Sequence, residues 1–459
     1  MTTAPGYAPP AAAWRPRLLP VPDEPGRPGQ GSQGGPGQGQ PGLAAHAGRH
    51  GPLRYRGGPG GLLAELEAAG LTGRGGAAFP VHRKLRAVLD ASARRHRAPA
   101  VIANAAESEP ASEKDATLLW LAPHLVLDGL QLAAEAAGAG TAVLAVHADR
   151  EGDVGARLHQ ALRERQQAGI DRVPVRLAAV PPRFLVGQET ALVSQLGGGP
   201  PIPQLVPPRV SERGLSGAPT LVQNAETLAH LALIARHGPA WFRSVGPAGE
   251  PGSMLATVWQ ATGGPHVTEV PLGVPLTNLT GPLKPDDAVL IGGYHGTWLT
   301  AAQASGLTLD NRSLAAPGAR LGAGVIATLP AQRCGLAETA RVVRYLALES
   351  AGQCGPCLNG LPRMAAALAD IAAGRPRPGT VEDVVRWSGL VTGRGACHHP
   401  DGTARFVRSA LRTFAAELGR HQRGRCSASD TRPVLPVPEP ARAGQDGFAS
   451  QDWLDQDVR

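Results

Sequence analysis

The sequence predicts an α/β protein with a parallel sheet, followed by a small β-rich module and a helical bundle. Three observations support this fold class: strand-like apolar runs alternate with amphipathic helices between 62 and 179, short β-like pieces lie between 249 and 306, and helical spacing returns from 336 to 418. At 459 residues the chain can form several domains with cores of their own.

The composition excludes several classes of protein. The net charge is +8, but the basic residues are spread along the chain, so no nucleic-acid partner is expected. No apolar run reaches about 18 residues and the N-terminus lacks a signal-peptide pattern, so we expect a cytoplasmic protein with no direct membrane insertion. Five cysteines are too few for a disulfide scaffold in a chain of this length, and reduced thiols are expected.

The two ends of the chain differ in composition from the rest. Residues 1–52 consist mainly of Pro, Gly, Gln and Ala, and residues 421–459 are rich in Pro, Ser, Asp and Arg. Segments with so few large apolar side chains bury too little surface to offset the entropy lost on ordering. We therefore expect both segments to be disordered.

A glycine-rich stretch, Leu71 to Pro80, follows the first helical run. Its glycines permit positive φ angles and a close approach of the main chain to a flat or anionic ligand. It is also compatible with an ordinary loop in which Gly70 and Gly73 end one helix and Pro80 begins the next. Lys84 follows closely, and because the chain holds only three lysines among 45 basic residues, its position favours the ligand-binding interpretation.

The apolar run Ala100 to Asn104 predicts a buried strand, and the loop after it carries Glu107, Ser108 and Glu109. Open α/β sheets bind ligands at the carboxyl ends of their strands, so this loop is a candidate ligand site. A solvated turn that enters a helix at Pro110 would have the same sequence. The other elements predicted in this region are helices over 124–137 and 154–168 and strands over 141–146 and 173–179.

Two further loops lie between a predicted strand and a predicted helix. The loop Phe184 to Leu192 contains a Gly-Gln-Glu-Thr sequence, and the loop Gly217 to Thr227 contains the amides Gln223 and Asn224. Amide side chains can satisfy the donor and acceptor edges of a planar heterocycle, but they also serve as plain helix caps.

Beyond the parallel sheet, the pattern changes twice. Short β-like pieces between 249 and 306 predict a small β-rich module. Four segments with helical spacing then follow with short connections, which predicts a bundle; they are 336–349, 361–373, 381–390 and 403–418.

Three cysteines of this predicted bundle have the spacing of metal ligands. Cys354 and Cys357 form a CxxC pair, and Cys397 lies in the loop before the last helix. Soft thiolates favour zinc or an iron–sulfur cluster. A redox-active CxxC would require a βαβ context that this region lacks, and unrelated buried cysteines are the remaining alternative. Cys334 and Cys426 have no partner at ligand spacing, and we interpret them as structural or incidental.

Taken in this order, the motifs resemble those of the NADH-binding flavoprotein subunit of respiratory complex I and its relatives in soluble NAD-linked hydrogenases and formate dehydrogenases. The resemblance runs from about 62 to 418 and identifies the chain as a divergent member. The family's GRGGAGFP loop is matched by Gly73 to Pro80 except at Ala78, its NADESEP loop by Asn104 to Pro110, its GEETAL loop by Gly187 to Leu192, and its TVNNVET loop by Leu221 to Thr227.

This resemblance implies an FMN-binding Rossmann-like domain, a small ubiquitin-like β-grasp module and a helical bundle that carries a 4Fe-4S cluster. The glycine-rich loop and the paired amides would hold FMN, the acidic loop would line the nicotinamide nucleotide site, and Glu189 would meet the adenosine ribose of NADH. The implied cofactor-binding residues are Gly73, Arg74, Gly75, Gly76, Phe79, Lys84, Asn104, Glu107, Ser108, Glu109, Gly187, Glu189, Thr190, Gln223 and Asn224, and the implied metal ligands are Cys354, Cys357 and Cys397.

The chain also departs from the family's pattern. Ala106 replaces an Asp, Gln188 the first Glu of GEETAL, and Phe184 a Tyr, and Val206 and Arg209 stand where the family has a Lys and an aromatic residue.

In the family's cluster motif, SCGxCxPC, Ala351 replaces the first of four cysteines. The site could hold a three-iron cluster or a four-iron cluster with a non-thiolate ligand, His398 or His399 could complete it, the same residues could hold structural zinc, or the site could be empty.

The resemblance implies an NADH dehydrogenase-like flavoprotein that transfers hydride from NADH to FMN and then single electrons to a ferredoxin-like iron–sulfur partner. No side chain is assigned an acid–base role. The alternative is a catalytically degenerate flavin-binding or scaffold subunit. The expected organisation is a disordered segment over 1–52, the FMN and NAD domain over 53–245, the ubiquitin-like module over 246–325, the bundle over 326–420 and a disordered tail over 421–459.

Overall fold

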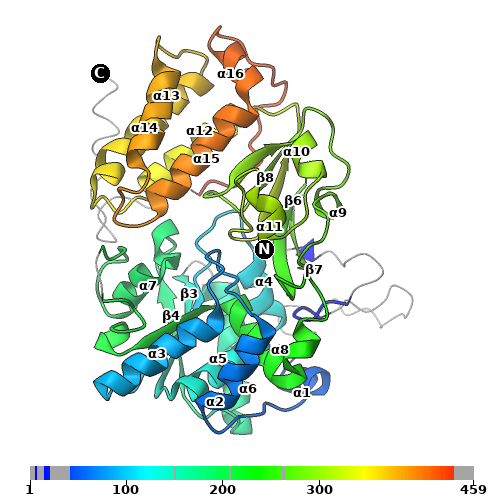
Figure 1. The fold of residues 1–459 in the computed structure, drawn as a ribbon, viewed down its shortest axis with the longest axis vertical. Coiled ribbons are helices and arrows are strands. Elements are labelled where there is room, and N and C mark those ends of the chain that lie inside the picture. Colours follow the sequence, from blue (N-terminus) through cyan, green and yellow to red (C-terminus); the bar gives the residue numbers. More distant parts are fainter. Residues whose placement is uncertain are drawn as a thin grey trace.

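The computed structural model describes residues 6–7, 15–20, 42–148, 151–205, 208–260 and 264–438. Its helices and strands form an α/β region, drawn in the lower part of Figure 1, with a β-rich region and a helical bundle next to each other above it. The disorder expected for 1–5, 8–14, 21–41 and 439–459, and the departure at position 206, concern residues outside this description.

The α/β region contains a four-stranded sheet in which every neighbouring pair is parallel. The strand order is β4-β3-β2-β5, with bounds Val175–Val180, Thr141–His147, Ala100–Ala105 and Thr220–Asn224. The chain therefore moves outward from β2 to β3 and β4, and then returns to the other side of β2 as β5. This reversal makes the carboxyl ends of β2 and β5 the point where open α/β sheets bind ligands.

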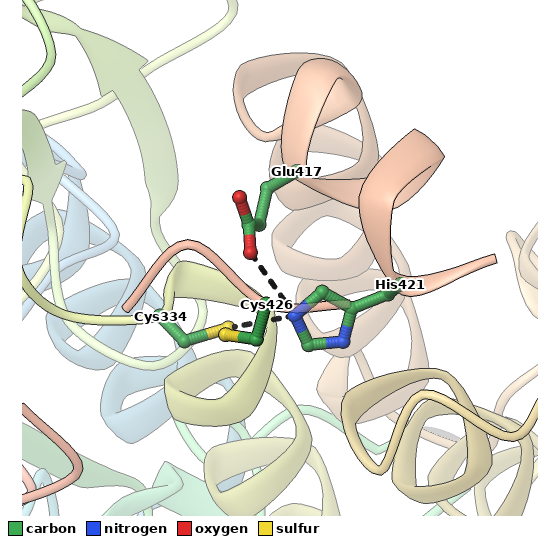
Figure 2. A group of neighbouring side chains, drawn as sticks. All are labelled: Cys334, Glu417, His421 and Cys426. Carbon is green, nitrogen blue, oxygen red and sulfur yellow. Dashed lines mark hydrogen bonds and ion pairs between the residues drawn. The ribbon is translucent and has the colours of Figure 1, made fainter. Parts of the chain in front are cut away.

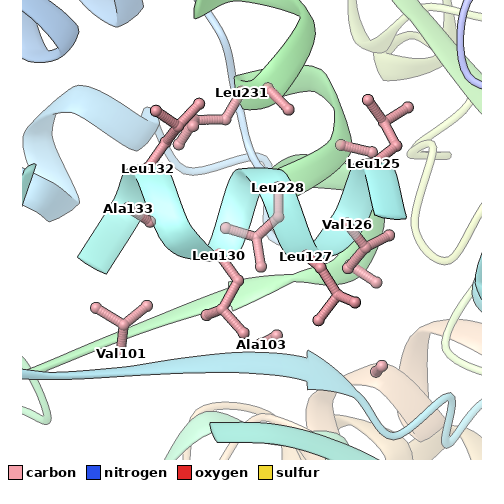
Figure 3. Packing of buried hydrophobic residues seen from close by; sticks show 14 of the residues in the cluster. Val101, Ala103, Leu125, Val126, Leu127, Leu130, Leu132, Ala133, Leu228 and Leu231 are labelled. Atoms are coloured by element: carbon pink, nitrogen blue, oxygen red, sulfur yellow. The ribbon is translucent and has the colours of Figure 1, made fainter. Parts of the chain in front are cut away.

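Helices cover this sheet. They are α1 (Leu43–His50), α2 (Pro59–Ala69), α3 (Val81–Arg95), α4 (Lys114–Leu121), α5 (Pro123–Ala137), α6 (Ala156–Ala168), α7 (Glu189–Leu196) and α8 (Ala225–Phe242), with short turns at Glu151–Gly155, Phe184–Gly187 and Leu215–Gly217. Leu127 and Leu130 of α5 point toward Val101 and Ala103 of β2, and α8 packs along the same helix (Figure 3). Because the sheet and neighbouring helices cover it, α5 is buried on almost every side, as its apolar composition requires.

The β-rich region is a six-stranded mixed sheet of order β1-β7-β6-β10-β8-β9. Its strands are β1 (Gly6–Tyr7), β6 (Ser253–Trp259), β7 (Pro265–Pro271), β8 (Ala288–Ile291), β9 (Thr297–Thr300) and β10 (Val325–Leu329), and its short helices are α9 (Thr277–Thr280), α10 (Ala301–Ser305) and α11 (Asn311–Ala315). Strands β6 and β10 are parallel and central, whereas β6 with β7 and β8 with β9 form antiparallel pairs.

The bundle consists of α12 (Gly335–Leu348), α13 (Leu361–Ala372), α14 (Thr380–Val391), α15 (His399–Thr413) and α16 (Ala415–His421), with a turn at Pro356–Gly360. Helices occupy the four segments where they were predicted, with one difference. The last predicted helix, 403–418, starts earlier, at His399, and is interrupted at Phe414, so that α16 is a separate helix.

The prediction of disorder was wrong for part of the N-terminal segment. The carboxylate of Glu269, in the buried β7, accepts hydrogen bonds from the backbone N–H groups of Arg17, Leu18 and Leu19, at 2.8, 2.8 and 3.3 Å. Both leucine side chains are 0% exposed, and residues 43–50 form α1. The average composition of 1–52 did not reveal that one apolar pair, Leu18 and Leu19, is buried, with its backbone N–H groups bonded to a carboxylate far away in the sequence.

The prediction was also wrong for the first part of the tail. Residues 424–438 lie against the bundle, where the carboxylate of Glu338 accepts hydrogen bonds from the backbone of Val434 and Leu435. The Leu435 side chain is buried in the bundle core, and the hydroxyl of Tyr294 donates to the carbonyl of Pro436. A few apolar residues are enough to order this segment because the bundle supplies both a core and an acceptor.

The packing of α5 on α8 leads to a test. A Cβ atom on Gly129 of α5 would stand 2.0 Å from the carbonyl oxygen of Leu228, so one backbone would have to move. We expect Gly129→Ala to lower the free energy of unfolding by about 1–3 kcal/mol or more, although Ala favours helix. Gly389 of α14 has open space around it, and Gly389→Ala should raise stability by up to about 1 kcal/mol. Denaturant unfolding of both variants measures the difference, and equal effects would contradict this close packing.

Candidate functional site

The candidate site lies where β2 and β5 end. Asn104 is paired with Asn224 across these two strands, and Ala103 is paired with Gln223. The chain reversal thus brings the acidic loop after β2 and the paired amides of β5 to one edge of the sheet. The sequence had placed these two motifs more than a hundred residues apart.

The glycine-rich loop closes over this edge. Its backbone folds back at Gly73, whose N–H donates to the carbonyl of Phe79 at 2.9 Å. A Cβ on Gly75 would lie 3.2 Å from Cβ of Asn224, so this glycine allows the loop to approach the end of β5 closely. The loop also needs positive φ angles, 102° at Gly76 and 51° at Ala78. Ala78 stands where the family pattern has glycine, and the left-handed conformation there costs roughly 1 kcal/mol.

Arg74 anchors this loop to neighbouring segments. Its side chain is buried, and its guanidinium donates to the carbonyls of Ser253 and Pro251 and to the hydroxyl of Thr72. Its backbone N–H donates to Thr227 at 2.8 Å. These contacts join the loop to β6 and α8, and a direct contact of Arg74 with the cofactor stays a prediction.

Lys84 and Glu189, which the sequence assigned to the nucleotide site separately, lie together. The ammonium of Lys84 donates to the Glu189 carboxylate at 3.0 Å and to the carbonyl of Val222 at 2.7 Å. Thr190 follows in α7, and its hydroxyl donates to Gln188 and accepts from the backbone of Gln204. The Phe79 side chain is 50% exposed at the rim of this region.

The acidic loop after β2 is held at both ends. Asn104 donates through its amide to the carbonyl of Gly187 at 2.9 Å, and Ser108 lies 3.2 Å from the Nε2 atom of His147. A Cβ on Gly187 would lie 2.6 Å from the Ser108 hydroxyl, so only glycine fits there. The acidic loop and the loop after β4 are therefore packed against each other.

The two glutamates of this loop face different neighbours. Glu107 accepts hydrogen bonds from the backbone of Asp115 and Ala116 at the start of α4, whereas Glu109 accepts one from the backbone of Tyr294 at 2.8 Å. Burial and the nearby charge of Asp115 raise the pKa of Glu107 to about 7. Burial raises the pKa of Glu109 to about 8. Without a ligand, both glutamates serve to fix the loop on its surroundings.

Gln223 has a buried donor without a partner. Its side chain is 5% exposed, and no described residue accepts a hydrogen bond from its Nε2 atom. Buried donors are almost always satisfied, so an acceptor is missing at this point. A heterocycle that carries carbonyl groups and lies over Gly75 would supply one, and these two observations fit the FMN that the resemblance implies.

A buried charge network lies next to the end of β5, and no sequence pattern predicted it. Lys114, 4% exposed, donates to Asp115 at 2.8 Å and pairs with Glu226 at 2.9 Å. Asp115 in turn accepts from the Asn224 amide at 2.6 Å, and Glu226 accepts from the backbone of Leu255 in β6. The rarity of lysine in this chain was the one signal that could have pointed to Lys114.

The pKa values of this network follow from its charges. Burial alone would lower the pKa of Lys114, but the carboxylates of Asp115 and Glu226 outweigh it and raise this pKa above its usual value. Burial would likewise raise the pKa of Glu226, but Lys114 and His230 lower it to about 2. Lys114 and Glu226 are therefore charged at neutral pH.

The three cysteines predicted as metal ligands lie in one part of the bundle. Burial, followed by the neighbouring thiols of Cys354 and Cys397, raises the pKa of Cys357 to about 12. These three sulfurs are not among the described ligand atoms that all lie within 4.8 Å of one another, as a single ion would require. Ala351, at the position of the missing thiolate, offers only a buried methyl group.

The two histidines next to Cys397 have other partners in this structure. His398 points into solvent and pairs with Asp401, with 3.2 Å between Nδ1 and the carboxylate. His399 is buried, and its two ring nitrogens contact the carbonyl of Leu346 at 2.8 Å and the ring of His295 at 3.1 Å. The alternative in which His398 or His399 replaces the missing thiolate stays a prediction.

Contacts between the bundle and the loop before α7 include an ion pair and a group of aromatic rings. Arg183, just before the loop Phe184 to Leu192, donates to the buried carboxylate of Glu349 at 3.0 Å. Phe184 contacts the rings of His295, Tyr345 and His399. The Phe that replaces the family's Tyr thus keeps the aromatic packing but carries no hydroxyl.

Among the described residues, no single helix is long and apolar enough to cross a membrane. Helices α4 and α5 pass that test only as a pair, by length and composition, and they are bent by 97° at their junction.

Comparisons with known proteins match both parts of this site. Residues 66–233 match the family model of the Nuo51 FMN-binding domain, and residues 337–421 match the iron–sulfur binding region of NADH-ubiquinone oxidoreductase-F.

Curated relatives carry the same description. The F subunit of NADH-quinone oxidoreductase from Streptomyces coelicolor is 30% identical over 382 residues, covering 80% of this chain and 84% of that protein. The F 2 subunit of NADH-quinone oxidoreductase from Rhizobium meliloti is 30% identical over 372 residues, covering 78% and 87%.

Solved structures of an NAD⁺-reducing [NiFe]-hydrogenase are also similar. The H₂-reduced state matches with a TM-score of 0.71 and 30% identity over 79% of this chain, and the air-oxidised state with 0.72 and 29% over 83%. This chain spans only 62% and 65% of the two hydrogenase chains, respectively.

The buried network provides a test of how the site is held. Lys114→Met would leave the carboxylates of Asp115 and Glu226 buried without their cation, so we expect the free energy of unfolding to fall by about 3–5 kcal/mol. Lys284 is exposed, and Lys284→Met should change stability by less than about 0.5 kcal/mol. Denaturant unfolding at neutral pH measures both variants. Similar losses for the two would show that Lys114 does not neutralise this site.

Proposed function

Since this chain belongs to the family of the NADH-quinone oxidoreductase F subunit, we propose that it binds FMN at the junction of β2 and β5, accepts hydride there from NADH, and passes single electrons to an iron–sulfur partner. The observation that carries this proposal is the partnerless Nε2 of Gln223 beside the close approach of Gly75 to Asn224. FMN supplies the step from a two-electron donor to one-electron acceptors.

The residues at this edge divide into two groups by position. The glycine-rich loop, the end of β2 and the end of β5 would hold the flavin, through Gly73, Gly75, Gly76, Asn104, Gln223 and Asn224. The rim and the two neighbouring loops would hold the nucleotide, through Phe79, Lys84, Glu107, Ser108, Glu109, Gly187, Glu189 and Thr190. Arg74 would act by placing the glycine-rich loop.

Glu189 would select NADH over NADPH. It stands at the start of α7, where a carboxylate can accept hydrogen bonds from two ribose hydroxyls but repels a 2′-phosphate. Lys84 at 3.0 Å orients this carboxylate. Gln188, which replaces a family glutamate, still caps α7, because its side-chain oxygen accepts from the backbone of Thr190 and Ala191.

The second candidate function is a flavin-binding or scaffold subunit without NADH oxidation. Two substitutions favour it: Ala106 removes a carboxylate from the acidic loop, and Ala351 removes one cluster ligand. The contacts that hold the loops in place are nevertheless present, including the tie between Arg183 and Glu349. We therefore keep the oxidoreductase as the main proposal.

We propose the domain bounds that the sequence led us to expect. The FMN and NAD domain would span 53–245, the ubiquitin-like β-grasp module 246–325 and the bundle 326–420. The hairpin β6–β7 lies on one side of β10 and the hairpin β8–β9 on the other, with β6 parallel to β10, and this order supports the β-grasp assignment. The partner would be a ferredoxin-like iron–sulfur protein, and a cytoplasmic location remains a prediction.

The function is tested by anaerobic titration of FMN-loaded protein with NADH. We expect wild-type protein to retain FMN and NADH to bleach it. Gly75→Val should abolish FMN retention, because the side chain would meet Asn224 and fill the space over the end of β5. Gly140→Val, at a glycine with open space, should retain it.

Circular dichroism must show that both glycine variants fold. Wild-type protein that binds no FMN would reject the proposal. Bound FMN that NADH cannot bleach would favour the scaffold function.

The cluster is tested by restoring its missing thiolate. Three thiolates leave one corner of a four-iron cluster without a protein ligand, so we expect the wild-type cluster to lose iron readily to chelators. Ala351→Cys should slow this loss and strengthen the four-iron EPR signal, whereas Ala351→Ser should not. Iron and sulfide per chain, measured after anaerobic reconstitution, give the result. If neither wild type nor Ala351→Cys holds iron, electrons do not leave through this bundle.

A further inference from the structure

Four metal-ligating side chains converge at the end of the bundle that is remote from the CxxC pair. They are Cys334 at the start of α12, Glu417 and His421 of α16, and Cys426 in the segment that follows (Figure 2). One ligand atom from each lies within 4.8 Å of all the others. Helix α12 runs from Cys334 toward Cys354 and is about 20 Å long, so this group is separate from the expected cluster.

The distances between these atoms match a single tetrahedral ion. Sγ of Cys334 lies 3.4 Å from Nε2 of His421, which in turn lies 3.2 Å from the Glu417 carboxylate. In a tetrahedral zinc site the usual bond lengths place sulfur about 3.6 Å from nitrogen and nitrogen about 3.3 Å from oxygen. The ligand atoms of Cys334 and Glu417 therefore already lie nearly as far from Nε2 of His421 as zinc would place them.

The orientation of His421 points to the same conclusion. Its Nδ1 atom donates to the carbonyl of Ile371 at 2.8 Å, which leaves the lone pair of Nε2 directed at the two sulfurs and the carboxylate. Histidine ligands of metals commonly use their other ring nitrogen in this way.

The other ligands are held as well. The Glu417 carboxylate accepts hydrogen bonds from the backbone and hydroxyl of Ser427 and from Arg420. The sulfurs of Cys334 and Cys426 accept from the backbone of Ala337 and Ala428, both at 3.4 Å. N–H donors aimed at sulfur stabilise thiolates, which are the form that binds metal.

We propose that Cys334, Glu417, His421 and Cys426 bind one structural zinc ion, which fastens the segment after α16 to the start of α12. Two thiolates, one imidazole and one carboxylate suit zinc, and the tight spacing of the donors excludes a multi-iron cluster. The ion would order the chain that continues from Cys426 to the buried Leu435. This site does not depend on the proposed redox function.

The proposal is tested by metal analysis of the full chain purified without chelators. We expect one zinc ion per chain in wild type, and a fall of at least about tenfold in Cys426→Ser and in His421→Ala. Cys426 is exposed, so its substitution should leave the fold, the iron content and FMN binding intact. Cys357→Ser is the matched control, since it should lower iron but keep zinc.

Cobalt provides a second measurement. Replacing zinc by Co²⁺ should produce the sulfur-to-cobalt charge-transfer absorption of thiolate ligands in wild type and weaken it in Cys426→Ser. A strong chelator should lower the Tm of wild type more than that of Cys426→Ser, because loss of cluster iron affects both proteins alike and only wild type also loses zinc.

Three results would overturn the proposal: wild type with much less than one zinc per chain after growth in zinc, zinc content unchanged in both ligand variants, or a Cys334–Cys426 disulfide in unreduced protein by mass spectrometry.

Discussion

The pairing of Lys114 with Asp115 and Glu226 is the interaction on which the arrangement of the candidate site depends. Three buried charges are tolerated only because each has an opposite partner within hydrogen-bond distance. The same carboxylates bind Asn224, at the end of β5, and the backbone of β6. A single lysine thereby joins the acidic loop, the amide pair and the β-rich region. These contacts fix the positions of the residues at the ends of β2 and β5.

The glycine-rich loop is anchored next to the same part of the β-rich region. Arg74 anchors the loop to the carbonyls of Pro251 and Ser253, and β6 begins at Ser253. The main chain can then pass close over Asn224, because Gly75 has no side chain to prevent it. Ala78 accepts a left-handed conformation in the same turn, so the loop keeps its shape at a position where the family pattern has glycine.

The bundle contains two cysteine groups. Cys354, Cys357 and Cys397 are the ligands that the family resemblance implies for an iron–sulfur cluster. Cys334 and Cys426 converge with His421 and Glu417 within the span of one ion. The CxxC group has lost one thiolate at Ala351, whereas the second group presents four ligand atoms. The two proposed metal sites would therefore have different roles: one would carry electrons, and the other would hold the C-terminal segment.

Local sequence determined the parts of the fold that depend on neighbouring residues. Apolar runs predicted β2 and β3, helical spacing predicted α5 and the bundle, and motif order predicted which loops carry the candidate site, because periodicity and turn chemistry act over a few residues. Tertiary structure alone decided the pairing of Lys114 with Glu226, the burial of Leu18 and Leu435, and the meeting of Cys334 with Cys426. Each of these joins segments far apart in the chain, and its stability comes from burial and charge pairing that no local pattern records.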